Sequence, residues 1–425
     1  MKIIEKIYQI YSQKYIITTD SRKVEPGCVF VALKGEHFDG NDFAYQVAND
    51  NIAACVIADR KSLPHHERLF VVDDSLTTLQ ELAKLHREKC NTPIIGITGT
   101  NGKTTTKELV ATVLSQKYNI IYTQGNFNNH LGVPLTLLQI KPDTEIAVVE
   151  MGANHPKEIE FLCSLAQPNF GIITNIGKAH IEGFGSFEGV ISTKNELYDY
   201  LRKTNGIVFL NNDNQLLKNL AFDLKIVNYG KDNNADCCAS ILSSNPYLSI
   251  IWNNKEINTK LVGDYNFENV MAAITVGCHF NIEPNLIIKA LENYSPTNNR
   301  SQYIKTNKNE IVMDAYNANP VSMSNAVKNF RNICDDNHLL ILGDMKELGI
   351  ESLNEHQEIL NLINELNFNN VILVGNEFNK VNSNFVSFLN VDELINHIEQ
   401  NTISGTKILI KGSHGIHLEK IINLL

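Results

Sequence analysis

The sequence lacks the long apolar run that a membrane-spanning helix needs. Such a helix takes about 18 or more consecutive apolar residues, and no such run occurs in the 425 residues of the chain. Residues 1–15 alternate apolar with charged side chains and have neither the apolar segment nor the small-residue cleavage site of an export signal. We therefore expect a cytoplasmic protein that does not insert into a membrane.

An excess of positive charge is also missing. Lys and Arg number 37 against 47 Asp and Glu, which gives a formal net charge of -10. Such a chain has no long-range field to attract nucleic acid, so we expect no nucleic-acid partner. Any anionic ligand must be held by local donors, and motifs that bind phosphate become the decisive features.

The eight cysteines do not form a metal or disulfide framework. No pair has the C-x-x-C spacing of zinc or redox sites, and only Cys237 and Cys238 are adjacent. The sequence also has no G-x-S-x-G turn and no paired Cys/His signal of covalent catalysis. We expect reduced, mostly buried thiols and a reaction that needs no nucleophile from the protein.

Length and an apolar content of 43% predict two or three domains. Residues 1–91 alternate short apolar runs with helical patterns, which predicts a small N-terminal α/β domain. Residues 92–295 carry continuous β-branched runs such as 94–98, which are typical of a parallel sheet covered on both faces. Residues 296–425 repeat the scheme and predict a doubly wound, Rossmann-like C-terminal domain.

The strongest chemical signal is TGTNGKTTTKE at residues 98–108. It lies between a strand pattern and a helical pattern, so its glycine turn would open a helix whose free N–H groups and dipole receive phosphate. In this P-loop geometry Lys103 would reach the terminal phosphates and the Thr104 hydroxyl would face Mg²⁺. Ile97 stands where the general G-x-x-x-x-G-K-[ST] motif has its first glycine, which disfavours an ordinary kinase or GTPase.

Two polar residues follow other strand patterns of the central block. Glu150 ends the run 146–150 and His180 comes just after 171–176, so both should reach the sheet edge that holds the glycine turn. Mg²⁺ prefers oxygen, which makes Glu150 with Thr104 the easier pair, whereas His180 would imply a second ion or Mn²⁺. Alone, each residue is more often structural, as a cap or a satisfied histidine.

Several segments in the same order resemble the Mur ligase family, and within it the members that add D-alanyl-D-alanine to UDP-N-acetylmuramoyl-tripeptide. The resemblance spans nearly the whole chain, from TDSRKVEPGCVFVALKG near its start to IKGSHGI near its end. The segments between these ends are residues 98–108, 123–138, 150–162, 174–186, 192–201, 266–274, 298–302 and 314–323.

The resemblance implies a ligase that uses ATP and Mg²⁺ or Mn²⁺, with ATP between the central and third domains. The residues implied around ATP are Gly99, Thr100, Asn101, Gly102, Lys103, Thr104, Thr105, Asn269, Arg300, Asp314 and Tyr316. The implied metal ligands are Thr104, Glu150, His180 and a carbamylated Lys194. Carbamylation by CO₂ turns an ammonium, which repels Mg²⁺, into an anion that attracts it. The implied catalytic residues are Lys103, Lys194, His180 and Glu150.

The resemblance also implies the two substrates, UDP-N-acetylmuramoyl-tripeptide and D-alanyl-D-alanine, and a monomeric enzyme. The uridine nucleotide would bind in the first domain to Asp20, Ser21, Arg22, Lys34 and Gly35. The path to the reacting carboxylate would be lined by Asn126, Asn128, Asn129 and His130. The incoming dipeptide would lie near Asn317, Asn319 and Pro320.

The implied mechanism is phosphorylation of the carboxylate by ATP, followed by attack of the dipeptide amine on the acyl phosphate. Positioning and charge neutralisation suffice for such chemistry, which agrees with the missing nucleophile motifs. Acyl phosphates hydrolyse in water, so we expect the domains to close about hinges at Thr92–Pro93 and near Ser295.

Three alternatives are less well supported. A ligase that adds the third residue of the stem peptide would carry the signature Asp-Asn-Pro-Arg, which is absent. A folate polyglutamate ligase would not have the uridine-type first domain. A non-catalytic nucleotide sensor is disfavoured because all the implied catalytic residues are present. Two positions depart from the family pattern: Lys157 replaces a frequent glycine and His414 a frequent arginine.

Overall fold

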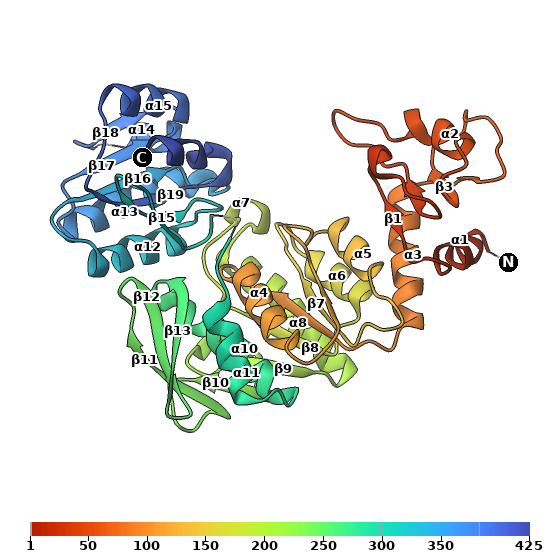
Figure 1. Cartoon of the computed structure of the whole chain (residues 1–425), viewed down its shortest axis with the longest axis horizontal. Coiled ribbons are helices and arrows are strands. Elements are labelled where there is room, and N and C mark those ends of the chain that lie inside the picture. The colour runs from red at the N-terminus through yellow and green to blue at the C-terminus, as the bar shows by residue number, and fades with distance from the viewer. Residues whose placement is uncertain (1, 298, 382) are drawn as a thin grey trace.

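The computed structural model describes residues 2–297, 299–381 and 383–425, so Asn298 of the segment 298–302 lies outside the described residues. The chain forms three sheets in three successive parts, shown in red to orange, orange to green, and cyan to blue in Figure 1. This arrangement confirms the predicted three-part α/β fold. None of the described helices is long and apolar enough to cross a membrane.

The first sheet has four parallel strands in the order β1-β2-β3-β4. Its strands are β1 (Ile17–Thr18), β2 (Val29–Val31), β3 (Cys55–Ala58) and β4 (Leu69–Val71). The helices of this part are α1 (Ile3–Tyr11), α2 (Asn41–Asn49) and α3 (Ser75–Lys89). Asp74 begins α3 by accepting a hydrogen bond from the backbone N–H of Thr77.

The central sheet has nine strands in the order β13-β12-β11-β10-β9-β8-β5-β7-β6. They are β5 (Ile94–Thr98), β6 (Ile120–Tyr122), β7 (Ile146–Glu150), β8 (Phe170–Ile173), β9 (Ile207–Asn211), β10 (Lys225–Gly230), β11 (Cys237–Ser243), β12 (Tyr247–Trp252) and β13 (Lys255–Val262). The helices are α4 (Lys103–Leu114), α5 (Gly132–Leu137), α6 (Glu158–Ala166), α7 (Ile181–Phe184), α8 (Phe187–Thr204), α9 (Gln215–Leu220), α10 (Phe267–His279) and α11 (Pro284–Asn293).

The expectation of a purely parallel central sheet was incomplete. β6 to β11 are parallel, but β12 pairs antiparallel with both β11 and β13. In β13, buried and exposed side chains largely alternate, as they do when one face of a strand meets solvent. β5 and β7 are instead buried along their whole length, with apolar clusters on both faces.

The third sheet has six strands in the order β14-β15-β19-β16-β17-β18, and only the β14–β15 pair is antiparallel. The strands are β14 (Gln302–Lys305), β15 (Glu310–Asp314), β16 (His338–Gly343), β17 (Val371–Val374), β18 (Val386–Phe388) and β19 (Lys407–Lys411). The helices are α12 (Pro320–Ile333), α13 (Ser352–Glu365), α14 (Asn376–Lys380) and α15 (Val391–Gln400).

The first and central parts share one apolar core. Residues of α1 and α3 belong to the same buried cluster as residues of α5, α6 and β7. The buried guanidinium of Arg87 in α3 donates to the carbonyl oxygens of Ala166 at 2.8 Å and Gln167 at 3.1 Å. Thr92, where the sequence predicts a hinge, is buried and donates to the Thr144 carbonyl. The junction is therefore anchored by the buried Thr92, although the neighbouring Asn91 is exposed.

Candidate functional site

A cavity of ≈ 720 Å³ lies between residues that follow the carboxyl ends of strands in the central and third sheets. The strand order reverses beside β5, which opens a crevice between the loops after β7 and β8. The cavity wall contains these sequence-predicted residues: Thr100, Asn101, Gly102, Lys103, Thr104, Thr105, Asn126, Asn128, Asn129, His130, Glu150, His180, Asn269, Arg300, Asp314, Tyr316, Asn317 and Asn319.

The loop 99–102 connects β5 to α4, and two glycines give it its shape. Gly99 has φ +142° and Gly102 has φ +78°, a region that L side chains rarely adopt. A Cβ on Gly102 would also lie 2.5 Å from Oδ1 of Asn269. The loop therefore needs glycine at both positions to reach the first turn of α4.

Lys103, the first residue of α4, lies folded over this loop. Its Nζ donates to the carbonyl oxygens of Gly99 at 2.8 Å and Thr100 at 3.0 Å. Burial, assisted by Arg300 and opposed by Glu150, lowers the pKa of the ammonium to about 8. An anionic phosphate would further stabilise the charged form and replace the two carbonyl contacts.

Glu150 and Thr104 meet at the bottom of the cavity, as the sequence predicts. Thr104 donates its hydroxyl to Oε1 of Glu150 at 3.1 Å, and the Asn128 amide donates to the same oxygen at 2.7 Å. Glu150 is 1% exposed, and its Oε2 is buried without a hydrogen-bond partner among the described residues. A buried carboxylate oxygen without a partner beside a hydroxyl fits the ligand preference of Mg²⁺.

His180 and Lys194 pack on the same aromatic ring. Lys194 Nζ lies 5.5 Å from the centroid of the Phe184 ring, and the His180 ring meets Phe184 edge to face at 6.3 Å. Lys194 is 2% exposed, unlike an ordinary lysine on a helix surface. Burial, followed by the charge of Lys103, lowers the pKa of Lys194 to about 7. Because this pKa lies near neutral pH, part of the amine is uncharged there, and an uncharged amine can react with CO₂.

These metal-site candidates do not form one compact cluster. Lys194 is not among the wall residues of the cavity, and Nδ1 of His180 contacts the carboxylate of Glu347 from the third domain. Within residues 2–297, 299–381 and 383–425, no group of three or more His, Cys, Asp or Glu side chains is placed to hold a metal ion. Glu150 with Thr104 is thus the better-formed half of the implied metal site.

Asn269, the implied adenine-side residue, is tied to the loop from α10. Its Oδ1 accepts from the Thr106 hydroxyl at 3.0 Å, and its Nδ2 donates to Oδ1 of Asn266 at 2.9 Å. The side chain is buried beside Gly102. Asn269 of α10 therefore restrains the loop at Gly102. Helix α10 also packs against α4, so the two helices hold the loop together.

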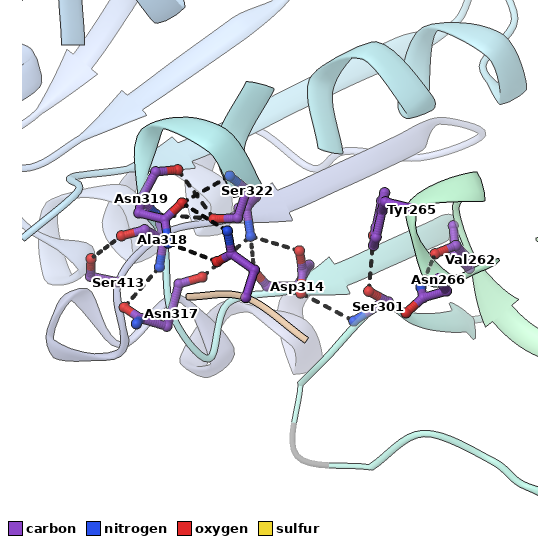
Figure 2. A network of polar contacts seen from close by, with 12 residues as sticks. Val262, Tyr265, Asn266, Ser301, Asp314, Asn317, Ala318, Asn319, Ser322 and Ser413 are labelled. Carbon is purple, nitrogen blue, oxygen red and sulfur yellow. Dashed lines mark hydrogen bonds and ion pairs between the residues drawn. The ribbon is translucent and has the colours of Figure 1, made fainter. Parts of the chain in front are cut away.

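The third domain contributes a cationic and aromatic wall. The Arg300 guanidinium carbon lies 3.7 Å from the centroid of the Tyr316 ring, and the His414 ring stacks on Tyr316 at 5.8 Å. His414, which stands where the family more often has arginine, is therefore part of this stack. Figure 2 shows Tyr265 joined to Ser301 through their hydroxyls at 2.9 Å, and the Ser301 N–H donating to Asp314.

Lys411 was not predicted as a site residue. It ends β19 beside Asp314, the last residue of β15, and its Nζ donates to Oδ2 of that carboxylate at 2.6 Å. Lys411 is buried and lines the cavity. A polar residue at the carboxyl end of the run 407–411 was the available signal, because parallel strands bring such ends together.

Asn319 links the third domain to the glycine loop. Its Nδ2 donates to Oδ1 of Asn101 at 2.7 Å, while its Oδ1 caps α12 by accepting from the Ser322 N–H at 2.9 Å. The capping contact is visible in Figure 2. Asn317 instead accepts from the Ala318 N–H. The sequence placed both residues near the dipeptide; Asn319 lies against the nucleotide loop, and its dipeptide role stays a prediction.

The implied uridine-site residues lie apart from the cavity, at the carboxyl edge of the first sheet. Asp20 accepts two hydrogen bonds from the guanidinium of Arg22, both at 2.9 Å, and this contact lowers the pKa of Asp20 to about 2. Ser21 follows Asp20, and Lys34 and Gly35 come after β2. Arg22 is 86% exposed, so the guanidinium remains accessible to an anionic ligand.

At Lys157, the other departure from the family pattern, the backbone keeps a conformation that glycine favours. Lys157 has φ +72° at the start of α6, in the left-handed region that glycine adopts most easily. The turn is retained without glycine. Its N–H donates to Oε1 of Glu196 at 2.8 Å, which helps to hold the left-handed conformation.

Comparison with known proteins agrees with this architecture. Three family models match: "Mur ligase family, catalytic domain" over residues 14–87, "Mur ligase middle domain" over 97–277 and "Mur ligase, glutamate ligase domain" over 299–414. The UDP-N-acetylmuramoyl-tripeptide--D-alanyl-D-alanine ligase of Bacillus subtilis is 36% identical, over 97% of this chain and 93% of the relative. The Escherichia coli ligase of the same name is 32% identical, over 96% and 93%.

Solved structures extend the likeness to the fold. MurF of Acinetobacter baumannii superposes with a TM-score of 0.83 at 30% identity, over 96% of this chain and 92% of that chain. MurF of Thermotoga maritima, solved in complex with ADP, gives a TM-score of 0.83 at 27% identity, over 100% and 98%. With family models covering most of the chain and relatives above 30% identity over nearly all of it, this protein belongs to the Mur ligase family.

Proposed function

We propose that this protein joins D-alanyl-D-alanine to UDP-N-acetylmuramoyl-tripeptide in peptidoglycan precursor synthesis, with hydrolysis of ATP to ADP and phosphate. One observation carries the proposal most directly. A glycine loop with Lys103 and the Thr104–Glu150 pair face Arg300 and Asp314 of the third domain across a single cavity. The nature of these precursors places the reaction in the cytoplasm, and we propose that the enzyme acts as a monomer.

ATP binds in the cavity, with its phosphates on the loop 99–105 and its adenine on the side of Asn269. The first turn of α4 supplies free N–H groups for the phosphates, and Lys103 exchanges its carbonyl contacts for phosphate oxygens. Arg300, held on the Tyr316 ring, is placed to offset negative charge on the transferred phosphoryl group.

The first domain holds the uridine nucleotide through residues 20–22 and 34–35, and the central and third domains complete the site. The nucleotide sugar runs from that edge toward the loop 126–130. Gln80 of α3 donates to the His130 carbonyl at 3.0 Å, which joins the loop 126–130 to the first domain. Asn126, Asn128 and Asn129 then guide the peptide carboxylate toward the γ-phosphate.

Metal ions shield the phosphate charge and polarise the phosphoryl oxygens when bound. Thr104 and Glu150 would hold Mg²⁺, because Oε2 of Glu150 has no hydrogen-bond partner among the described residues and suits a hard cation. Lys194, once carbamylated, and His180 would hold a second ion, for which Mn²⁺ would also be suitable. Burial keeps the Lys194 amine partly neutral, as reaction with CO₂ requires.

The reaction proceeds in two steps. The substrate carboxylate attacks the γ-phosphorus, the bond to the bridging oxygen breaks, and ADP leaves an acyl phosphate behind. The free amine of D-alanyl-D-alanine then attacks the acyl carbon and loses its proton; the new C–N bond forms as the C–O bond to phosphate breaks. The protein supplies position and opposite charge, because ATP activates the carboxylate and the reaction needs no covalent nucleophile from the protein.

Phosphate release tests the proposal. Purified protein with ATP and Mg²⁺ should release phosphate only when both UDP-N-acetylmuramoyl-tripeptide and D-alanyl-D-alanine are present. Lys103→Met should lower kcat by about 100-fold or more, because the cation nearest the phosphates is gone. Lys117→Met removes an exposed lysine just beyond α4 and should leave kcat unchanged. ATP binding without phosphate release would favour a nucleotide sensor, and release with a free amino acid instead of the dipeptide would favour a different Mur ligase.

A further inference from the structure

Lys107 and Glu108, the last two residues of the segment TGTNGKTTTKE, take no part in the proposed reaction. Lys107 lies in α4 one turn after Lys103, but it is not among the wall residues of the cavity and is 1% exposed. Burying an ammonium costs free energy unless its partners compensate the charge. The partners of Lys107 therefore indicate what the residue does.

The ammonium of Lys107 holds one backbone carbonyl. Its Nζ donates to the carbonyl oxygen of Thr123 at 2.8 Å. The same Nζ lies 5.5 Å from the centroid of the Tyr122 ring and 3.6 Å from Oε1 of Glu108, so an aromatic face and a carboxylate offset its charge. These contacts place the cation at the end of β6, where the chain leaves the central sheet.

Thr123 is the residue at which the pairing of β6 with β7 ends. Its N–H still donates to the Val148 carbonyl at 3.0 Å, as in a parallel ladder. If the ladder continued, the Thr123 carbonyl would accept the next N–H of β7, which belongs to Glu150. Instead, the Thr123 hydroxyl accepts this N–H at 3.0 Å. The side chain of Thr123 thus leaves its own carbonyl to Lys107.

The segment that leaves the sheet here is the loop 124–130, which contributes Asn126, Asn128, Asn129 and His130 to the cavity wall. A second anchor lies further along this loop. Nδ2 of Asn128 donates to Oε1 of Glu150 at 2.7 Å, and the Gly152 N–H donates to the Asn128 carbonyl at 2.7 Å. The course of the loop therefore depends on the contacts at Thr123 and at Asn128.

We propose that Lys107 is a positioning residue for the acceptor substrate, because through Thr123 it sets the course of the loop that guides the peptide carboxylate. The proposal rests on the role of this loop in the proposed function. It gives α4 two tasks: its first turn presents the phosphate loop, and its next turn holds the start of the carboxylate path. One rigid helix thereby places both reactants of the first step.

Lys107→Met tests the proposal, because it keeps an unbranched apolar side chain and removes the ammonium. At saturating ATP and D-alanyl-D-alanine, kcat/KM for UDP-N-acetylmuramoyl-tripeptide should fall about 10–100-fold, as a misplacement of about 1 Å can cause. The Kd of a non-hydrolysable ATP analogue, measured by calorimetry, should stay at the wild-type value. Backbone hydrogen exchange should become faster at residues 124–129 and stay unchanged at 99–105.

Glu108→Gln is the matched control. It removes the neighbouring charge, while the amide oxygen can still accept from the Tyr294 hydroxyl and the Lys107–Thr123 hydrogen bond is kept. This variant should therefore retain the wild-type kcat/KM. Thr123→Val approaches the same contact from the other side, because at position 123 only the carbonyl can then accept the Glu150 N–H, which draws it away from Lys107. The loss in kcat/KM and the exchange pattern of Lys107→Met are expected again.

The proposal would be overturned by a wild-type kcat/KM in Lys107→Met, or in Thr123→Val if the first variant does not fold. An equal loss in Glu108→Gln would also overturn it, since the ion pair would then explain the effect. A loss of ATP-analogue affinity as large as the loss in kcat/KM would show that Lys107 only supports α4. Hydrogen exchange needs no turnover, so the loop contact is tested even if the wild-type chain releases no phosphate and the proposed function fails.

Discussion

At the scale of single residues, the site is marked by two buried lysines in different surroundings. Lys411 is buried with its Nζ on the Asp314 carboxylate, an opposite charge that offsets desolvation. Lys194 is equally buried, but no hydrogen bond or ion pair involves its Nζ within the described parts of the chain, and its Nζ faces the Phe184 ring instead. An ammonium left in this position destabilises the fold, which is a mark of function rather than of structure.

Lys194→Met should therefore make the protein more stable and inactive. The folded-state pKa of about 7 lies below the ordinary 10.5, so between these values the unfolded chain binds more protons and wild-type stability rises with pH. In CO₂-free buffer at pH 7 the variant should gain on the order of a few kcal/mol in free energy of unfolding. The gain should vanish above about pH 10. Urea unfolding at the two pH values measures it, and a variant no more stable than wild type at pH 7 would contradict the burial argument.

Residue patterns predicted part of this site. Some site residues could be placed because they lie at the ends of strong patterns. Glu150 ends a strand pattern, and Lys103 and Thr104 open a helical pattern. The burial of Lys194 could not, since a lysine within a helix gives no local sign that an aromatic residue such as Phe184 covers it. The contact of Glu347 with His180 joins two domains, and nothing in either segment alone indicates the partner.

At the scale of elements, Asn319 has two separable tasks. Its Oδ1 caps α12 and its Nδ2 holds the glycine loop through Asn101. Asn319→Ser keeps a capping hydroxyl and loses the amide, so stability should stay near wild type while the KM for ATP rises. Asn319→Ala loses both and should in addition cost about 1 kcal/mol of stability. Steady-state kinetics and denaturant unfolding of the pair check this; equal ATP KM values in Asn319→Ser and wild type would refute the loop contact.

The first turn of α6 allows a second test at this scale. Lys157 holds φ +72°, so Lys157→Gly should stabilise the protein by about 0.5–1 kcal/mol because glycine adopts this region without steric cost. The exposed ion pair with Glu160 at 3.0 Å is lost but contributes little. Lys157→Ala removes the same pair and keeps the strained conformation, so it should not stabilise. Thermal unfolding compares the two variants, and a gain in Lys157→Ala would show that the side chain, not the backbone, is the unfavourable element.

Elements that are buried on both faces were predictable, whereas the edge of the central sheet was not. β5 and β7 begin and end where their apolar runs do. β11 to β13 mix buried and exposed side chains. Serines interrupt the apolar residues of β11 and β12, and Lys, Glu, Asn and Thr interrupt those of β13, so no long apolar segment marks these strands. Such strands are held by pairing with neighbours, which a local pattern does not reveal.

At the scale of the whole molecule, the two junctions differ in chemistry. The first and central parts share a continuous apolar core, with Arg87 and Thr92 hydrogen-bonded inside it. The third domain meets the cavity through polar contacts, among them Asn101–Asn319 and His180–Glu347, and its apolar contact with the central part is the smaller one that Tyr247 and Val262 make with its core. Polar interdomain contacts can exchange with water at little cost, whereas separating an apolar core cannot. Of the two hinges expected from the sequence, only the one near Ser295 remains suited to motion.

Closure should therefore be a movement of the third domain alone. Small-angle scattering should show a smaller radius of gyration when the wild-type chain is given a non-hydrolysable ATP analogue with UDP-N-acetylmuramoyl-tripeptide, because bound phosphates attract Arg300 toward the loop. Lys103→Met, which loses the phosphate contact, should not contract with the analogue. Hydrogen exchange should slow around residues 299–301 on ligand addition and stay unchanged at 91–93. Superimposable scattering profiles with and without ligands would exclude closure, and ligand-dependent exchange at 91–93 would assign the motion to the other junction.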